Sequence, residues 1–306
     1  MKHSIKITLI LLVMFFAAQL IGLAVINAYS PQVVPITTET GEIQNITSYN
    51  LPYGTNPPEG IRPSYSLISI VIAFFIAILL IFILMRINAE FLFRMWFFFV
   101  VTVALGVTIN AALLGIKYSS LIALALALPL AFIKIFKRNI LVHNATELAI
   151  YPGIAAIFVP LLSIWTAVLL FVLISVYDMY AVWHSGIMQK MAKYQIQKVR
   201  VFAGFFVPYL GKKEAALVKS LSPSKLKKKK IKVHLGILGG GDIVFPIILA
   251  GVVFHAIGLV PALMISAGAT LGLAFLFIIS KRGKFYPAMP FITAGCFIAL
   301  ALAYLI

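Results

Sequence analysis

The feature that most constrains this chain is a succession of apolar runs long enough to cross a lipid bilayer. A transmembrane helix needs about 17 to 25 predominantly apolar residues. Runs near this length predict nine spans, at residues 7–28, 66–86, 95–115, 119–136, 145–159, 161–183, 233–254, 257–280 and 287–306. The alternation typical of barrel strands is absent, so we expect helices. The predicted fold is an all-α polytopic membrane protein.

The basic residues predict how these spans are oriented. If the amino terminus is cytosolic, nearly all of the 25 Lys and Arg residues are cytosolic, and only Arg62 and Lys117 lie outside. This asymmetry follows the positive-inside rule. The fifth run is short and merges with the sixth, but a map of eight spans would place Lys281, Arg282 and Lys284 outside. We therefore expect nine spans, with the amino terminus cytosolic and the carboxyl terminus outside.

Composition excludes several other classes of protein. Only 11% of the residues are charged, against about 25% in soluble domains, so lipid is expected to cover most of the surface. The net charge of +17 does not indicate nucleic-acid binding, because the basic residues form short blocks between apolar runs. The first run exceeds the roughly 7–15 residues of a signal-peptide core, so we expect it to be retained. Cys296 is the only cysteine, which argues against a disulfide framework or a CxxC metal site; we expect no cofactor and no metal.

The spans divide the chain into three parts. Residues 1–183 hold the first six spans, residues 184–232 form a basic cytosolic loop, and residues 233–306 hold the last three spans. The loop contains a lysine-rich run at 225–230 and is expected to lie near anionic lipid headgroups. The polar outer loop carries a glycosylation sequon at Asn45. We expect an integral protein of the cell membrane.

Two aspartates lie well inside predicted spans, Asp178 in the sixth and Asp242 in the seventh. A carboxylate in hydrocarbon is costly and predicts a functional site. Counted along the helices, Asp178 would lie about 7 Å and Asp242 about 13 Å from the cytosolic ends of their spans, a difference that tilt can absorb. Two close carboxylates cannot both ionise and share one proton, which is the acid/base pair of an aspartic protease.

The same pair would also suit a proton-coupled transporter or leak pathway, because transporters place carboxylates at mid-membrane. The two aspartates alone do not separate these functions. The glycines at 239–241 would let backbone approach Asp242, although small residues also serve helix packing. Tyr177 could stack on a partner or donate a hydrogen bond. A transporter would usually show two similar halves, and we find no such repeat.

The last run begins Pro287-Ala288-Met289-Pro290. Prolines lack an N–H group and free backbone carbonyls in a helix. Free backbone at membrane depth must line protein or a watery cavity. A helix start led by proline is the simpler interpretation.

Together these segments resemble the signatures of one family. Tyr177-Asp178, Gly239-x-Gly241-Asp242 and Pro287-Ala288-Met289-Pro290, in this order on nine spans, are similar to the motifs of presenilins and signal peptide peptidases, and of microbial presenilin homologues in particular. Met289 stands where the family usually has Leu, a volume-conserving change. The basic loop lacks an evident hydrophobic segment for self-cleavage.

The resemblance implies proteolysis within the transmembrane helices of substrate proteins. Asp178 and Asp242 would be the catalytic pair, with Tyr177, Gly239 and Gly241 supporting the site. The motif at 287–290 would position the substrate.

Other proteases fit less well. Prepilin peptidases also carry Gly-x-Gly-Asp, but they would not explain nine spans or the motif at 287–290. The His-Glu-x-x-His run of zinc proteases is absent from the sequence, and Ser185 does not fit a rhomboid-type nucleophile. A catalytically silent relative is disfavoured because both aspartates are present. The sequence therefore predicts an intramembrane aspartyl endopeptidase, and leaves its substrate and oligomeric state open.

Overall fold

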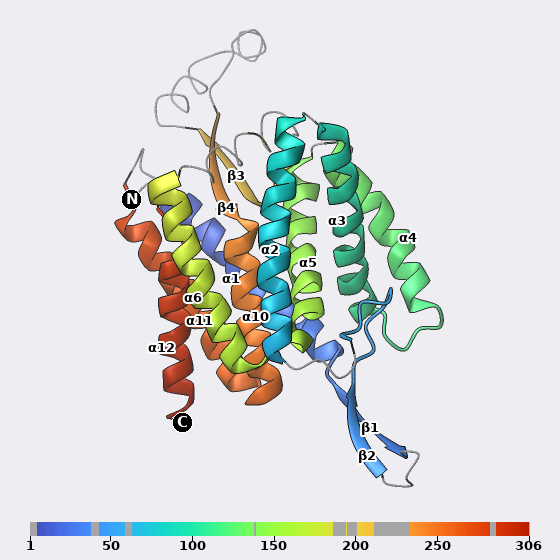
Figure 1. Cartoon of the computed structure of the whole chain (residues 1–306). Helices are drawn as coiled ribbons and strands as arrows, with labels where there is room; N and C mark the ends of the chain where they lie inside the picture. The colour runs from blue at the N-terminus through green and yellow to red at the C-terminus, as the bar shows by residue number, and fades with distance from the viewer. Residues whose placement is uncertain are drawn as a thin grey trace.

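The computed structural model shows a bundle of helices with two small hairpins (Figure 1). It describes residues 5–37, 43–58, 63–87, 89–137, 139–185, 194, 201–210, 233–281 and 286–305. Within these residues there are nine α-helices: α1 (Ile5–Ala28), α2 (Pro63–Arg86), α3 (Glu90–Ala112), α4 (Ser119–Phe132), α5 (Ile140–Phe158), α6 (Ile164–Tyr180), α10 (Gly240–Ala256), α11 (Leu259–Ile279) and α12 (Met289–Ala303). Short π-helices extend α4 (Ile133–Lys137) and α6 (Ala181–Ser185).

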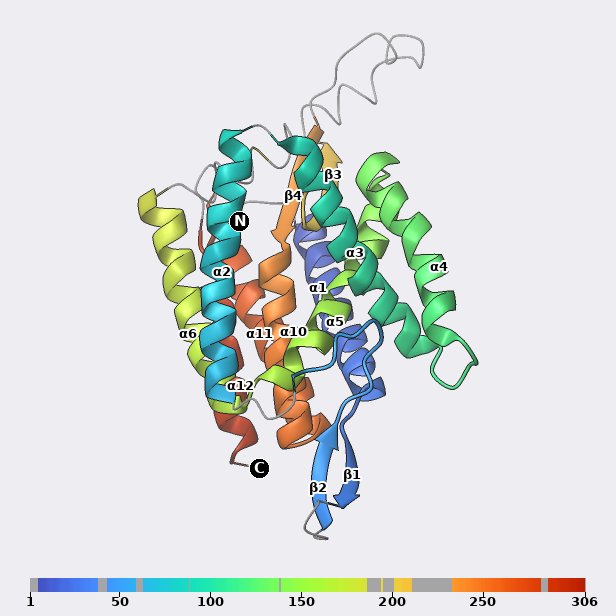
Figure 2. The ribbon, with the colours of Figure 1, turned by 45° about the vertical axis from the view of Figure 1, so that its right-hand side comes forward.

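Most of these helices have the length and composition of membrane spans. Seven of the described helices are long and apolar enough to cross a membrane, α4 and α6 when they are counted with their π-helical extensions, while α10 and α12 are apolar but have only 17 and 15 residues. Figures 1 and 2 place the two chain termini at opposite ends of the bundle. The predicted helical, polytopic architecture is thus confirmed, and the number of spans and their orientation remain predictions.

Several expectations fall on parts of the chain that are not described. Lys2, Arg282, Lys284 and the lysine run at 225–230 lie outside the described residues, as does most of the predicted basic loop. Asn45, in the predicted sequon, belongs to strand β2 (Ile43–Ser48). This strand pairs antiparallel with β1 (Gln32–Thr37), and the two project from one end of the bundle (Figure 1).

The start of the predicted seventh span was wrong. Residues expected to open that helix form strand β4 (Val233–Gly239), which pairs antiparallel with β3 (Gly204–Leu210). The segment is apolar, and apolarity alone does not distinguish a short strand from a helix. Its glycines weaken a helix by about 1 kcal/mol each, whereas β3 supplies the hydrogen bonds of a ladder. The helix therefore begins only at Gly240.

A break separates α5 from α6, where the sequence nearly joins two apolar runs. A 3-10 turn at Val159–Leu161 follows α5. Ser163 then forms a capping box with Thr166: its hydroxyl accepts from the Thr166 N–H at 3.3 Å, and the Thr166 Oγ1 accepts from the Ser163 N–H at 2.8 Å. α6 therefore starts as a separate helix, and Asp178 falls in its last turn.

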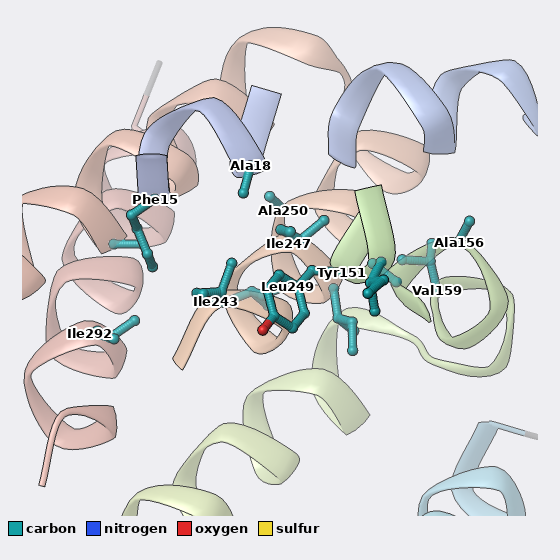
Figure 3. Packing of buried hydrophobic residues seen from close by; sticks show 14 of the residues in the cluster. Phe15, Ala18, Tyr151, Ala156, Val159, Ile243, Ile247, Leu249, Ala250 and Ile292 are labelled. Atoms are coloured by element: carbon teal, nitrogen blue, oxygen red, sulfur yellow. The ribbon is translucent and has the colours of Figure 1, made fainter. Parts of the chain in front are cut away.

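α10 lies at the centre of the bundle, in contact with α1, α5, α6, α11 and α12. Figure 3 shows the packing around it, with side chains from α1 (Phe15 and Ala18), α5 (Tyr151 and Ala156), α10 (Ile243 and Ile247) and α12 (Ile292).

Next to this core, α11 and α12 approach backbone to backbone. A Cβ atom on Gly268 would lie 2.4 Å from the carbonyl oxygen of Gly295, and one on Gly272 would lie 2.3 Å from that of Phe291. Such contacts between small residues are typical of membrane helix pairs.

Candidate active site

Asp178 is held at the junction of α6 and α12. Its residue is 6% exposed, and its Oδ2 accepts a hydrogen bond from the backbone N–H of Met289 at 3.0 Å. The Ala288 N–H is also directed at this carboxylate. One turn earlier on α6, the Ser175 hydroxyl hydrogen-bonds the Thr293 hydroxyl at 2.7 Å. Two side chains of α6 thus fix it against the beginning of α12.

The motif at 287–290 acts through N–H groups rather than through the free carbonyls that its prolines suggested. α12 begins at Met289, so Pro290 occupies its first turn, where proline is favoured. N–H groups in a first turn have no partner within their helix, and the positive end of the helix dipole attracts carboxylates. The structure therefore agrees with the simpler interpretation of a proline-led helix start. The N–H groups at this helix start face Asp178.

Asp242 lies in the first turn of α10, with Gly239 as the N-cap. It therefore does not lie about 13 Å along a helix, as expected, because the residues before Gly240 form strand β4. A Cβ on Gly239 would lie 3.2 Å from the Asp242 Oδ2, so the absence of a side chain leaves room for the carboxylate. Gly241 is less constrained, since a Cβ there would meet only the Phe245 ring, at 3.7 Å.

The three predicted segments come together in space. α6, α10 and α12 pack on one another, and the Asp178 and Asp242 carboxyl groups are close enough to interact electrostatically. Two neighbouring carboxyl groups that are shielded from solvent can share one proton. The arrangement therefore has the parts needed for general acid/base chemistry.

Tyr177 lies beside this pair but contacts another helix. Its half-buried ring meets the ring of Phe74 on α2 edge to face, with centroids 5.1 Å apart and planes at 87°. This geometry is favourable for aromatic pairs. The expected aromatic contact is thus present, and it links α6 to α2.

The α10 backbone near Asp242 receives support that the sequence did not reveal. Pro246 has no N–H, so the carbonyl of Asp242 lacks its helical partner. The next carbonyl, that of Ile243, accepts a hydrogen bond from Nε2 of Gln19 on α1 at 3.1 Å. Gln19 is fully buried. The available signal in the sequence was an amide side chain in the middle of the apolar run at 7–28.

A buried polar cluster on α5 was also missed. His143, Glu147 and Tyr151 are four residues apart and share one helix face. Lys134, in the π-helical extension of α4, forms a buried ion pair with Glu147. The spacing of these residues in the sequence could have indicated that they share a helix face. It could not have indicated which residues of other elements contact that face.

The same end of α5 holds the edge of β3. The Asn144 side chain donates to the Phe206 carbonyl at 2.7 Å and accepts from the Phe206 N–H at 3.0 Å. The His143 Nε2 lies 2.8 Å from the Gly204 carbonyl oxygen. Through these contacts α5 fixes the hairpin that leads into Asp242.

Comparison with known proteins gives one family and one fold. The family model described as signal-peptide peptidase, presenilin aspartyl protease matches residues 45–306. A structure of a presenilin family intramembrane aspartate protease in space group C222 is 16% identical, with a TM-score of 0.57 over 97% of this chain and 98% of that one. Another in space group P2 is 17% identical, with a TM-score of 0.54 over 96% of each chain. No curated protein matches the chain.

Proposed function

Because the chain belongs to the signal-peptide peptidase and presenilin family of aspartyl proteases, we propose that it is an intramembrane endopeptidase with Asp178 and Asp242 as its catalytic pair. The resemblance inferred from the three motifs is confirmed by the family match. The protein is an integral multi-pass membrane protein, and its family acts on transmembrane helices. The observation that carries the proposal is the proximity of two carboxyl groups, that of Asp178, which is buried and held by the start of α12, and that of Asp242, which is partly buried.

The proposed reaction uses the shared proton. The ionised aspartate takes a proton from water, and this water attacks the peptide carbonyl while the protonated aspartate donates to the carbonyl oxygen. The roles reverse as the tetrahedral intermediate collapses. Since Oδ2 of Asp178 accepts from the Met289 N–H, the shared proton resides on the other oxygen of Asp178 or on Asp242.

The surroundings of the pair support specific roles. Gly239 leaves room for the Asp242 carboxylate, Gly241 continues that turn, and Tyr177 supports α6 from the α2 side. The segment 287–290 would position the substrate next to Asp178. A substrate helix must unwind locally before cleavage, because its own hydrogen bonds occupy the scissile backbone.

The wider interpretation follows the three-part division of the chain. We propose that the lysine-rich run at 225–230, within the basic loop at 184–232, is attracted to anionic headgroups of the cell membrane, and that this loop joins the part that carries Asp178 to the part that carries Asp242. The family match disfavours a proton-coupled transporter and a prepilin-type peptidase.

The test is cleavage of a single-span helical substrate by purified protein in detergent. Asp178→Ala and Asp242→Ala should each abolish cleavage, and a transition-state-mimicking aspartyl protease inhibitor should block the wild type. Glu90→Gln, which removes a carboxylate at the start of α3, is the matched control and should remain active. Cleavage that persists after either aspartate change would contradict the proposed mechanism.

A further inference from the structure

The polar cluster on α5 ends at the turn that carries Asp242. Lys134 and Glu147 form the buried ion pair at one end, and each side chain is 1% exposed. One helical turn beyond Glu147, Tyr151 is 2% exposed. The cluster thus runs from the ion pair along one face of α5 toward the start of α10.

Two atoms of this cluster make no hydrogen bond of normal geometry to a described residue, namely the Tyr151 hydroxyl and Oε2 of Glu147, although the Tyr151 and Glu147 side chains are close enough for a weak one. A buried polar group without a partner destabilises the fold and calls for an explanation. Tyr29, at the other end of the bundle, shows the ordinary situation. Its buried hydroxyl lies 2.8 Å from the Val107 carbonyl oxygen and 2.8 Å from the Asn110 Oδ1.

The Tyr151 hydroxyl lies directly over the glycine turn. A Cβ on Gly240 would be 2.7 Å from this oxygen, and Gly240 is two residues before Asp242. The hydroxyl is close enough to both Asp242 and Glu147 to interact electrostatically. Figure 3 shows the Tyr151 ring among apolar side chains of the core.

We propose that Tyr151 is a positioning residue for Asp242, whose hydroxyl donates to the Asp242 carboxylate when the active site is occupied and interacts only weakly with Glu147 when it is empty. A tyrosine hydroxyl has one proton to donate, so the two carboxylates compete for it. The ion pair with Lys134 keeps Glu147 available as an acceptor. The inference rests on the proposed function of the aspartate pair.

The alternative is that Tyr151 only fills space. A phenylalanine would fill the same volume without burying an unpaired hydroxyl. The two interpretations therefore predict different results for Tyr151→Phe in the full-length protein. A positioning role predicts a kcat lower by about 10-fold to 100-fold, the rate equivalent of one hydrogen bond to a charged group. It also predicts an unchanged KM and a thermal midpoint equal to or above that of the wild type.

Tyr29→Phe is the matched control. It removes a satisfied buried hydroxyl far from the aspartates, so its thermal midpoint should fall while its kcat, measured well below that midpoint, stays unchanged. Opposite effects of the same chemical change at two buried tyrosines would distinguish positioning from packing.

Two results would overturn this inference while leaving the proposed function in place. One is a Tyr151→Phe protein with wild-type kcat on a substrate that the wild type cleaves. The other is a Tyr151→Phe protein that melts earlier or does not fold, because the hydroxyl would then be structural. If the wild type cleaves no substrate and binds no aspartyl protease inhibitor, the proposed function itself fails and the inference falls with it.

Discussion

At the scale of single residues, Asp178 is held by backbone. The Met289 N–H reaches its carboxylate, while the Met289 side chain is buried and takes no part in that bond. Main-chain donors are fixed by the helix that carries them and do not depend on a rotamer. The site therefore depends on where α12 begins more than on which side chain stands at its first position.

Met289→Leu should consequently be almost silent. The change conserves volume and leaves the N–H in place, so the free energy of unfolding should fall by less than about 1.5 kcal/mol. We expect kcat within about twofold of the wild type, measured on the same single-span substrate. A tenfold loss would show that the Met289 side chain itself contacts the substrate.

The ion pair of Lys134 and Glu147 offers a second test at this scale. Removing one partner leaves an uncompensated buried charge, which costs about 3–5 kcal/mol, so Lys134→Met or Glu147→Leu should each destabilise the protein strongly. The double variant should recover most of that loss, because both charges are then gone. Unfolding in detergent micelles measures all three, and a double variant as unstable as the sum of the singles would contradict a direct pair.

At the scale of elements, the start of α10 depends on pairing between distant segments. β4 forms only because β3 lies beside it, and β3 is held from its other side by Asn144. The Asn144 amide thereby makes the two hydrogen bonds to the Phe206 backbone that a neighbouring strand would make. The position of Asp242 thus depends on a contact between α5 and β3.

Asn144→Leu should loosen this connection. It leaves the N–H and the carbonyl of Phe206 without their partner, at about 1–3 kcal/mol for each group that stays buried. Hydrogen–deuterium exchange of the peptide covering 204–210 should rise, and cleavage should slow. Unchanged exchange at Phe206 would mean that the ladder with β4 is sufficient by itself.

These contacts explain what could be predicted from the sequence. Hydropathy predicted most of the helices within a few residues, because an apolar run of membrane length has few alternatives. Residue type and order predicted the three motif segments. The strand at 233–239, the N–H groups facing Asp178 and the position of Tyr151 depend on contacts between segments far apart in the chain. Periodicity within one segment carries no information about them.

At the scale of the whole molecule, the orientation of the bundle is open to direct measurement. Cys296 is fully buried, so the wild type should react little with a membrane-impermeant thiol reagent. Leu305 is 83% exposed at the carboxyl-terminal end, and Lys6 is exposed at the start of α1. In intact cells, Leu305→Cys should be labelled and Lys6→Cys should be protected. The reverse pattern would invert the orientation predicted from the basic residues.

The close contact of α11 with α12 has a mechanical consequence. Glycines at 268, 272 and 295 bring the two backbones so near that even a methyl group would collide, so neither helix can slide along the other without separating. We therefore expect the pair to move as one body, with Met289 at its edge. On this view, a rearrangement that admits a substrate would take place mainly in other helices, and Asp178 would move relative to the start of α12 rather than the reverse.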